Sequence, residues 1–164
     1  MPKANQRLRA LLTGLTLAAP ITALALHAPV TPSQEVDDAA SQAYKLYVDL
    51  HQHPELSGNE TQTSAKLAAA LKAQGYTVTE HIGGTGFVAI LKNGAGPTIM
   101  LRSELDALPV EEKTGLPFAS KVRAKDPNGR DVGVGHMCGH DVHMSALVAT
   151  AGIMARLQIG RAHV

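Results

Sequence analysis

Eight consecutive residues in the last third of the chain, His136–His143, read HMCGHDVH. They bring three imidazoles, the only cysteine and one carboxylate together, so the backbone there has to turn tightly. Gly139 allows such a turn, because glycine adopts backbone conformations that other residues avoid. A thiolate with two or three imidazoles suits zinc, nickel, cobalt or manganese. The run therefore predicts a metal site in which Cys138 and His140 are ligands.

Two other chemistries stay open for this run. Cys138 could be a nucleophile paired with a histidine, although protease cysteines usually take their base from a distant part of the sequence. The run could also bind an ion in a catalytically silent protein. Heme attachment needs a Cys-x-x-Cys-His pattern and a structural zinc finger needs a second ligand pair, and neither pattern occurs in the sequence.

The residues after the predicted ligands suggest supporting roles. Asp141 follows His140 directly and is suited to orient a metal-bound imidazole. Residues 141–157 are apolar on nearly every side, which predicts a buried helix with one stripe formed by His143, Leu147, Ala151 and Met154. We expect His143, one turn into this helix, to contact the metal ligands without binding the metal itself.

An α/β fold with a helix-covered sheet is predicted for the middle of the chain. Residues 76–82, 87–91 and 98–101 are β-forming segments separated by glycine-rich turns. The last of them, with Ile99–Leu101, is apolar at consecutive positions, as in a strand buried on both faces. Residues 121–131 contain a Pro-Asn-Gly turn and predict an exposed hairpin.

Two carboxylates directly follow the expected buried strand. Glu104 and Asp106 lie where open α/β sheets bind their ligands, at the carboxyl end of a strand. Loop acids are often merely solvated, so the residues alone leave a solvated surface and a functional role both open.

An amphipathic pattern predicts a first helix that starts after Ser33 and ends before Pro54. Ser33 is the expected cap of this helix. His51 and His53 close it, and from their position we expect both at the surface or in a cap, with neither a ligand.

A second helix is predicted over residues 61–74. Ser57 and Glu60 before it have the spacing of a capping box. Gly75 directly after it is a common helix terminator.

The first 28 residues have the anatomy of a secretory signal peptide. Basic residues precede an apolar run that ends in Ala-x-Ala at residues 23–25. We expect cleavage of residues 1–28, a linker at 29–33, a periplasmic or secreted protein, and no stable membrane association after cleavage. An uncleaved membrane anchor is the alternative, although the run is short and contains Pro20.

The charge balance argues against a nucleic-acid partner. The formal net charge is +1, but three of the 15 basic residues lie in the leader, so the rest of the chain carries 12 basic and 14 acidic residues. Nucleic-acid binding typically uses basic stripes with stacking aromatics. This sequence has no Trp and is 3% aromatic.

Four motifs follow one another along the chain. They are HQHPEL at 51–56, LRSELDALP at 101–109, EEKTGLP at 111–117 and CGHD at 138–141. In this order they resemble the M20 metallopeptidase family, specifically its amidohydrolase branch of hippurate hydrolase, aminoacylase and auxin-conjugate hydrolase type. The resemblance covers residues 36–157. Glu104 stands where aspartate is commoner and Met137 where a small residue is commoner, and both departures leave the predicted ligands untouched.

The resemblance implies a site with two divalent metal ions, zinc, manganese, nickel or cobalt, that Cys138 and His140 help to bind. It makes Asp106 a site-shaping or outer-shell residue, alongside Asp141 and His143. It also moves one of the two histidines of HQHPEL toward the rim of the active site.

The implied activity is hydrolysis of the amide bond of N-acyl amino acids or small peptides. The resemblance implies a zinc-peptidase-like catalytic domain, interrupted by a lid or dimerisation domain, and is compatible with a homodimer. Residues 34–157 then form the amino-terminal part of this domain. The catalytic Glu-Glu pair is expected beyond Val164, so no catalytic residue is expected within the chain, which we expect to be inactive by itself.

The last seven residues, 158–164, resemble the in-frame translation of a short-read sequencing adapter. We interpret them as a non-native tail with no function; an ordinary polar helix end is the alternative.

Overall fold

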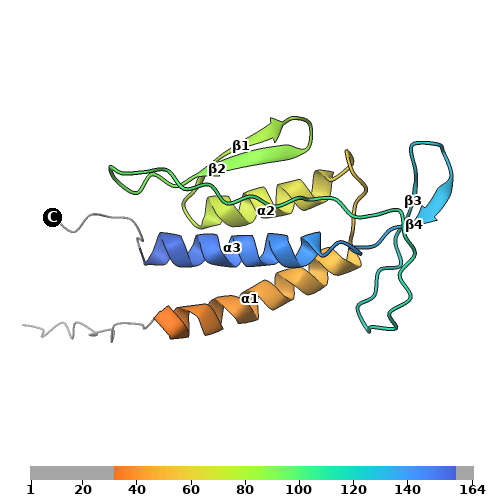
Figure 1. Cartoon of the computed structure of the whole chain (residues 1–164), viewed down its shortest axis with the longest axis horizontal. Coiled ribbons are helices and arrows are strands. Elements are labelled where there is room, and N and C mark those ends of the chain that lie inside the picture. Colours follow the sequence, from red (N-terminus) through yellow and green to blue (C-terminus); the bar gives the residue numbers. More distant parts are fainter. Residues whose placement is uncertain (1–31, 158–164) are drawn as a thin grey trace, which may run out of the picture.

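The computed structural model describes residues 32–157 as three helices and two antiparallel hairpins (Figure 1). The elements are α1 (Pro32–Gln52), α2 (Thr61–Ala73), β1 (Thr77–Ile82), β2 (Gly86–Ile90), β3 (Arg123–Lys125), β4 (Asp131–Gly133) and α3 (His140–Arg156). None of the helices in this range is long and apolar enough to cross a membrane. The expected signal peptide, the first three residues of the linker and the expected tail lie outside the described residues.

The first helix begins earlier than its predicted cap. α1 starts at Pro32, so Ser33 lies inside the helix and not directly before it as predicted. Proline suits the first helical turn because its missing N–H has no intrahelical acceptor there. The helix ends at Gln52, two residues before Pro54, as predicted.

The second helix starts and ends where predicted, but without the predicted cap. Gly75 adopts a φ of +92°, and the N–H groups of Gly75 and Tyr76 donate to the carbonyls of Lys72 and Leu71 at 3.0 and 3.1 Å. This pairing closes the helix in a Schellman motif. The capping-box prediction is wrong, because the Glu60 carboxylate instead accepts from the Gly58 N–H and the Thr85 hydroxyl.

The main core forms where α3 packs between α1 and α2 (Figure 1). Its buried members come from all three helices: Leu50, Leu67, Met144 and Val148. The α3 face that packs here contains Met144, Val148 and Ala151. Of the predicted stripe, Ala151 is buried and His143 is exposed. A helix that is apolar nearly all round does not reveal its buried face by periodicity, so packing decides it.

The α/β class predicted from the sequence is confirmed. α2 covers the hairpin of β1 and β2, in which Thr77 pairs with Ile90 and Glu80 with Phe87. The second hairpin, β3 with β4, turns through Asp126–Gly129 as predicted.

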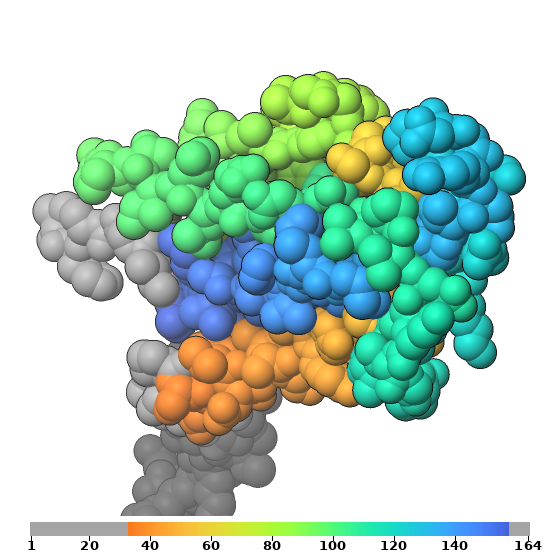
Figure 2. All heavy atoms as spheres, turned by 45° about the vertical axis from the view of Figure 1, so that its right-hand side comes forward, coloured from red at the N-terminus to blue at the C-terminus, as the bar shows by residue number. Residues whose placement is uncertain are grey.

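The predicted buried strand at residues 98–101 is wrong. Its apolar residues are exposed, Ile99 by 73% and Met100 by 83%, and the stretch lies on the outside of the molecule (Figure 2). A strand needs hydrogen-bonding neighbours, and no segment within residues 32–157 pairs with this one.

A second apolar cluster holds the hairpin of β3 and β4 against the loops. It contains Leu56, Ala107 and Val134. Close by, β4 approaches the backbone of Glu111: a Cβ added at Gly133 would lie 2.7 Å from the Cα atom of Glu111. The contact requires glycine because no side-chain atom fits between the two backbones.

We predict that Gly133→Ala destabilises the full-length protein by about 1–3 kcal/mol, because the new methyl group must displace backbone. Gly152→Ala in α3 is the matched control. Its Cβ would meet only the flexible side chains of Gln74 and Arg156, at 3.1 and 3.2 Å, and alanine favours a helix over glycine by about 1 kcal/mol. Urea unfolding measures both; equal stability of the two variants would contradict the close backbone contact.

Candidate metal centre

Three loop segments meet at the amino end of α3. The N–H of Ala107 donates to the carbonyl of Glu55 at 2.8 Å, and Leu108 and Gly135 exchange two backbone hydrogen bonds of 3.0 and 3.1 Å. Gly139, with a φ of +76°, then turns the chain into the helix, in the left-handed region that favours glycine. This turn places the predicted ligands Cys138 and His140 on either side of it.

His140 is oriented through its Nδ1 atom. This nitrogen lies 2.9 Å from the backbone oxygen and 3.0 Å from the carboxylate Oδ1 atom of Asp106. Both oxygens accept, so Nδ1 carries the proton, and in the neutral ring the lone pair is on Nε2. No described residue hydrogen-bonds Nε2, which leaves it for an external ligand. Metal-binding histidines are typically oriented by a carboxylate or carbonyl in this way.

A buried histidine lies at the centre of a second network. His51 Nδ1 is 2.6 Å from Asp141 Oδ2, and its Nε2 is 3.0 Å from Glu112 Oε1. The rings of Tyr47 and Phe118 pack around it, with centroids 5.4 and 5.5 Å away. The prediction of a surface or cap position is wrong for His51, which is 6% exposed.

His51 and Glu112 each shift the pKa of the other. Burial alone lowers the pKa of His51, but the hydrogen bonds to Asp141 and Glu112 outweigh it, so the pKa is raised. Burial raises the pKa of Glu112, but hydrogen bonds from Thr114, His51 and the Ser120 N–H lower it overall. Both shifts favour an imidazolium paired with carboxylate.

The other histidines of the HMCGHDVH run have different surroundings. His136 is buried, and neither ring nitrogen has a partner among the described residues. Burial lowers its pKa, and the nearby charge of Asp141 offsets this only in part. His143 is exposed, with its ring centroid 6.2 Å from that of His140.

The donors present fit part of the coordination shell of a divalent metal ion. His140 presents Nε2, and Cys138 presents an exposed thiol two residues earlier. The buried imidazole of His136, without a partner, is a further polar group that the fold leaves unsatisfied. Within residues 32–157, however, no three His, Cys, Asp or Glu side chains already form a metal-binding group. The described part of the chain therefore offers an incomplete shell.

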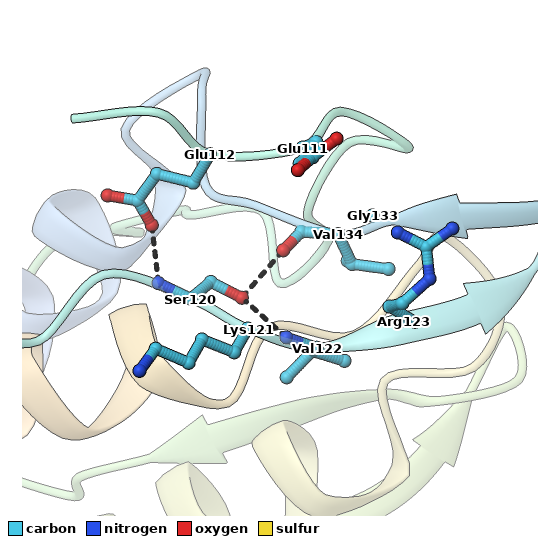
Figure 3. Close-up of a pocket in the computed structure, with 8 residues that line it drawn as sticks. All are labelled: Glu111, Glu112, Ser120, Lys121, Val122, Arg123, Gly133 and Val134. Atoms are coloured by element: carbon cyan, nitrogen blue, oxygen red, sulfur yellow. Dashed lines mark hydrogen bonds between the residues drawn. The ribbon is translucent and has the colours of Figure 1, made fainter. Parts of the chain in front are cut away.

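A polar cavity of about 240 Å³ is lined by Glu112, one of the residues that contact His51 (Figure 3). Glu112 forms one wall, where its Oε2 atom accepts from the Ser120 N–H at 2.5 Å. The Ser120 hydroxyl in turn donates to the carbonyl of Val134 at 2.7 Å. Neither Cys138 nor His140 lines this cavity, so it is separate from the candidate metal centre.

The sequence prediction identified one part of this arrangement and missed another. Asp106 lies against His140, and Asp141 lies nearby but binds His51 rather than His140. His51 and Glu112 were missed as network members. One signal for His51 was available, because the resemblance moved one histidine of HQHPEL toward the site; the other, His53, is exposed and paired with Asp49.

Comparison with known proteins gives consistent matches. The pattern of Peptidase family M20/M25/M40 matches residues 100–162. N-acetyl-L-cysteine deacetylase of Bacillus subtilis is 43% identical over 110 residues, which cover 66% of this chain and 24% of that protein. Hippurate hydrolase of Campylobacter jejuni is 38% identical over 122 residues, covering 74% of this chain and 30% of the hydrolase.

A solved structure agrees with these relatives. The YXEP protein of Bacillus subtilis, described as a dinuclear metal binding peptidase from the M20 family, has a TM-score of 0.63 and 34% identity. The match covers 74% of this chain and 32% of that one, so the chain spans about a quarter to a third of the length of these three proteins. The matched pattern spans the segment with the histidine–cysteine run, and the relatives and the solved structure agree with it, which identifies residues 100–162 as part of a Peptidase family M20/M25/M40 domain.

Proposed function

We propose that the full-length protein is a metal-dependent amidohydrolase that cleaves the amide bond of N-acyl amino acids or small peptides. The observation that carries the proposal is the orientation of His140, whose Nδ1 is held by Asp106 while Nε2 is left for a ligand. The deacetylase and hippurate hydrolase relatives support the substrate class.

Each residue has a defined task in this proposal. Cys138 and His140 bind one side of a two-ion site for zinc, manganese, nickel or cobalt, which the dinuclear neighbour supports. Divalent ions supply polarisation of the scissile carbonyl and activation of water. Asp106 keeps the His140 proton on Nδ1. Proton transfer to the leaving amine is assigned to the glutamate pair expected after Val164, so we propose that residues 1–164 alone do not turn over substrate.

The metal assignment is tested by a graded series of variants in the full-length protein. Cys138→Ala and His140→Ala are expected to lose bound metal and hippurate hydrolysis together. Asp106→Asn, which keeps the ligands but loses the orienting charge, is expected to weaken metal affinity by about 10–100-fold. His53→Ala, an exposed histidine outside the site, is the control and is expected to retain both. Metal content by mass spectrometry and hydrolysis rates provide the measurements.

Alkylation separates the metal site from a cysteine nucleophile. A metal-bound thiolate is expected to resist iodoacetamide until a chelator is added. Full metal occupancy with unchanged hydrolysis in both ligand variants would reject the site assignment. Chelator-insensitive activity that iodoacetamide abolishes would favour a cysteine nucleophile, and bound metal without any hydrolysis would favour a silent metal-binding protein.

We also propose that the protein is exported to the periplasm or the medium after cleavage of its leader. Basic residues, an apolar run and Ala-x-Ala at residues 23–25 support this proposal. Mass spectrometry of the protein expressed in a bacterial host is expected to find an amino terminus between about Leu26 and Val30. An intact Met1 on protein recovered outside the cytoplasm would contradict cleavage.

A further inference from the structure

His51 is placed between two buried carboxylates. It lies in the last turn of α1, where a positive charge is favoured by the helix dipole. The side chains of its partners, Asp141 and Glu112, are 2% and 0% exposed. An ionised carboxylate only accepts hydrogen bonds, so contacts of both ring nitrogens with carboxylates require both nitrogens to donate. His51 is therefore an imidazolium.

The positive charge matters because the carboxyl groups of Asp141 and Glu112 are buried on either side of the same ring. Within the described residues, no Lys or Arg forms an ion pair with Asp141 or Glu112. Removing one partner of a buried ion pair leaves the opposite charge uncompensated, which is strongly destabilising. His51 therefore compensates buried charge in addition to packing between Tyr47 and Phe118.

The network connects directly to the candidate metal centre. Asp141 is the residue after His140 and lies in the first turn of α3, whereas Glu112 belongs to the loop that follows residue 109. His51 therefore ties the end of α1 and this loop to the turn that presents Cys138 and His140.

We propose that His51 is a positioning residue: its imidazolium, shared by Asp141 and Glu112, holds the first turn of α3 in the arrangement that binds metal. The inference rests on the proposed metal site and deepens it. The hydrogen bonds of the His51 ring go to Asp141 and Glu112 and not to a predicted ligand, so His51 acts through Asp141, and its effect is on metal affinity and geometry rather than on the reacting atoms.

The network has a defined pH window. The groups facing His51 are Asp141 on α3, Glu112 on the loop, Tyr47 on α1 and His136 before α3. The pKa of His51 is raised from its ordinary 6.5, so its contribution is complete below that value and is lost as the pH rises through the folded-state pKa. The pKa of Glu112 is lowered from 4.5, so its contribution is complete above 4.5 and is lost as the pH falls through the folded-state pKa.

The test uses cobalt(II) titration of the full-length apoprotein, followed through the thiolate-to-cobalt absorption of Cys138. His51→Gln removes the charge and keeps a hydrogen-bonding amide. We expect it to weaken cobalt affinity by about 10–100-fold near neutral pH. We expect the wild-type protein to lose affinity as the pH rises through the folded-state pKa of His51, and the variant to show no such loss. His53→Gln, at the same end of α1 but exposed, is the matched control and should behave like wild type.

A double variant separates charge from shape. His51→Gln with Glu112→Gln removes one of the two uncompensated carboxylates, so we expect it to recover part of the affinity lost in His51→Gln. A role in packing alone predicts no recovery. If circular dichroism shows that His51→Gln is unfolded, ¹⁵N NMR of the His51 imidazole in the wild-type protein tests the proposal instead. The proposal requires protons on both ring nitrogens at pH 6.

The outcomes distinguish the two proposals. A wild-type protein that binds no cobalt refutes the metal site itself. A wild-type protein that binds cobalt, with a folded His51→Gln variant of equal affinity, refutes only the role of His51. An equal loss in His53→Gln, or a ring nitrogen of His51 without a proton, also refutes it.

Discussion

The amino end of α3 depends on one imidazolium shared by two buried carboxylates. His51 brings together three parts of the chain that are distant in sequence, because Asp141 lies 90 positions after it and Glu112 lies 61 positions after it. In a poorly solvated interior, an unpaired carboxylate and an unpaired imidazolium are both destabilising, so each stabilises the other. The arrangement of the helix ends follows from satisfying this charge balance.

The three histidines in and around the candidate site, His51, His136 and His140, differ in the hydrogen-bond partners of their rings. His51 has an acceptor on each ring nitrogen, which favours the charged ring. His140 has acceptors on one nitrogen alone, which selects a tautomer with a free lone pair. His136 has no partner among the described residues and is buried, which favours the neutral ring. One residue type thus supplies a cation, a potential ligand and an unsatisfied polar group within one small region.

The described part of the molecule is packed unevenly. Around α3 the core is closed by Leu50, Met144 and Val148, and the loops are joined by backbone hydrogen bonds. The stretch at Ile99–Leu101, in contrast, exposes three large apolar side chains in a row. Apolar residues at consecutive positions are typical of a strand with neighbours on both sides, and within residues 32–157 that arrangement is not formed.

Local interactions explain what the sequence by itself determined: the α/β class, the end of α2 at Gly75, the end of α1 before Pro54, the turn at Asp126–Gly129, and the crowding of Cys138 and His140. Each depends on backbone preferences or on residues a few positions apart. The sequence did not determine which face of α3 is buried, because that helix is apolar almost all round.

The tertiary structure alone decided the partners of the histidines. The contact of His140 with Asp106 spans 34 residues, and the contacts of His51 span still more. From the sequence alone, a histidine at a helix end is expected at the surface. The spacing of residues along the chain does not indicate whether distant carboxylates pack onto it. Burial and charge pairing are properties of the folded chain, so the environment that distinguishes His51 from His53 arises only on folding.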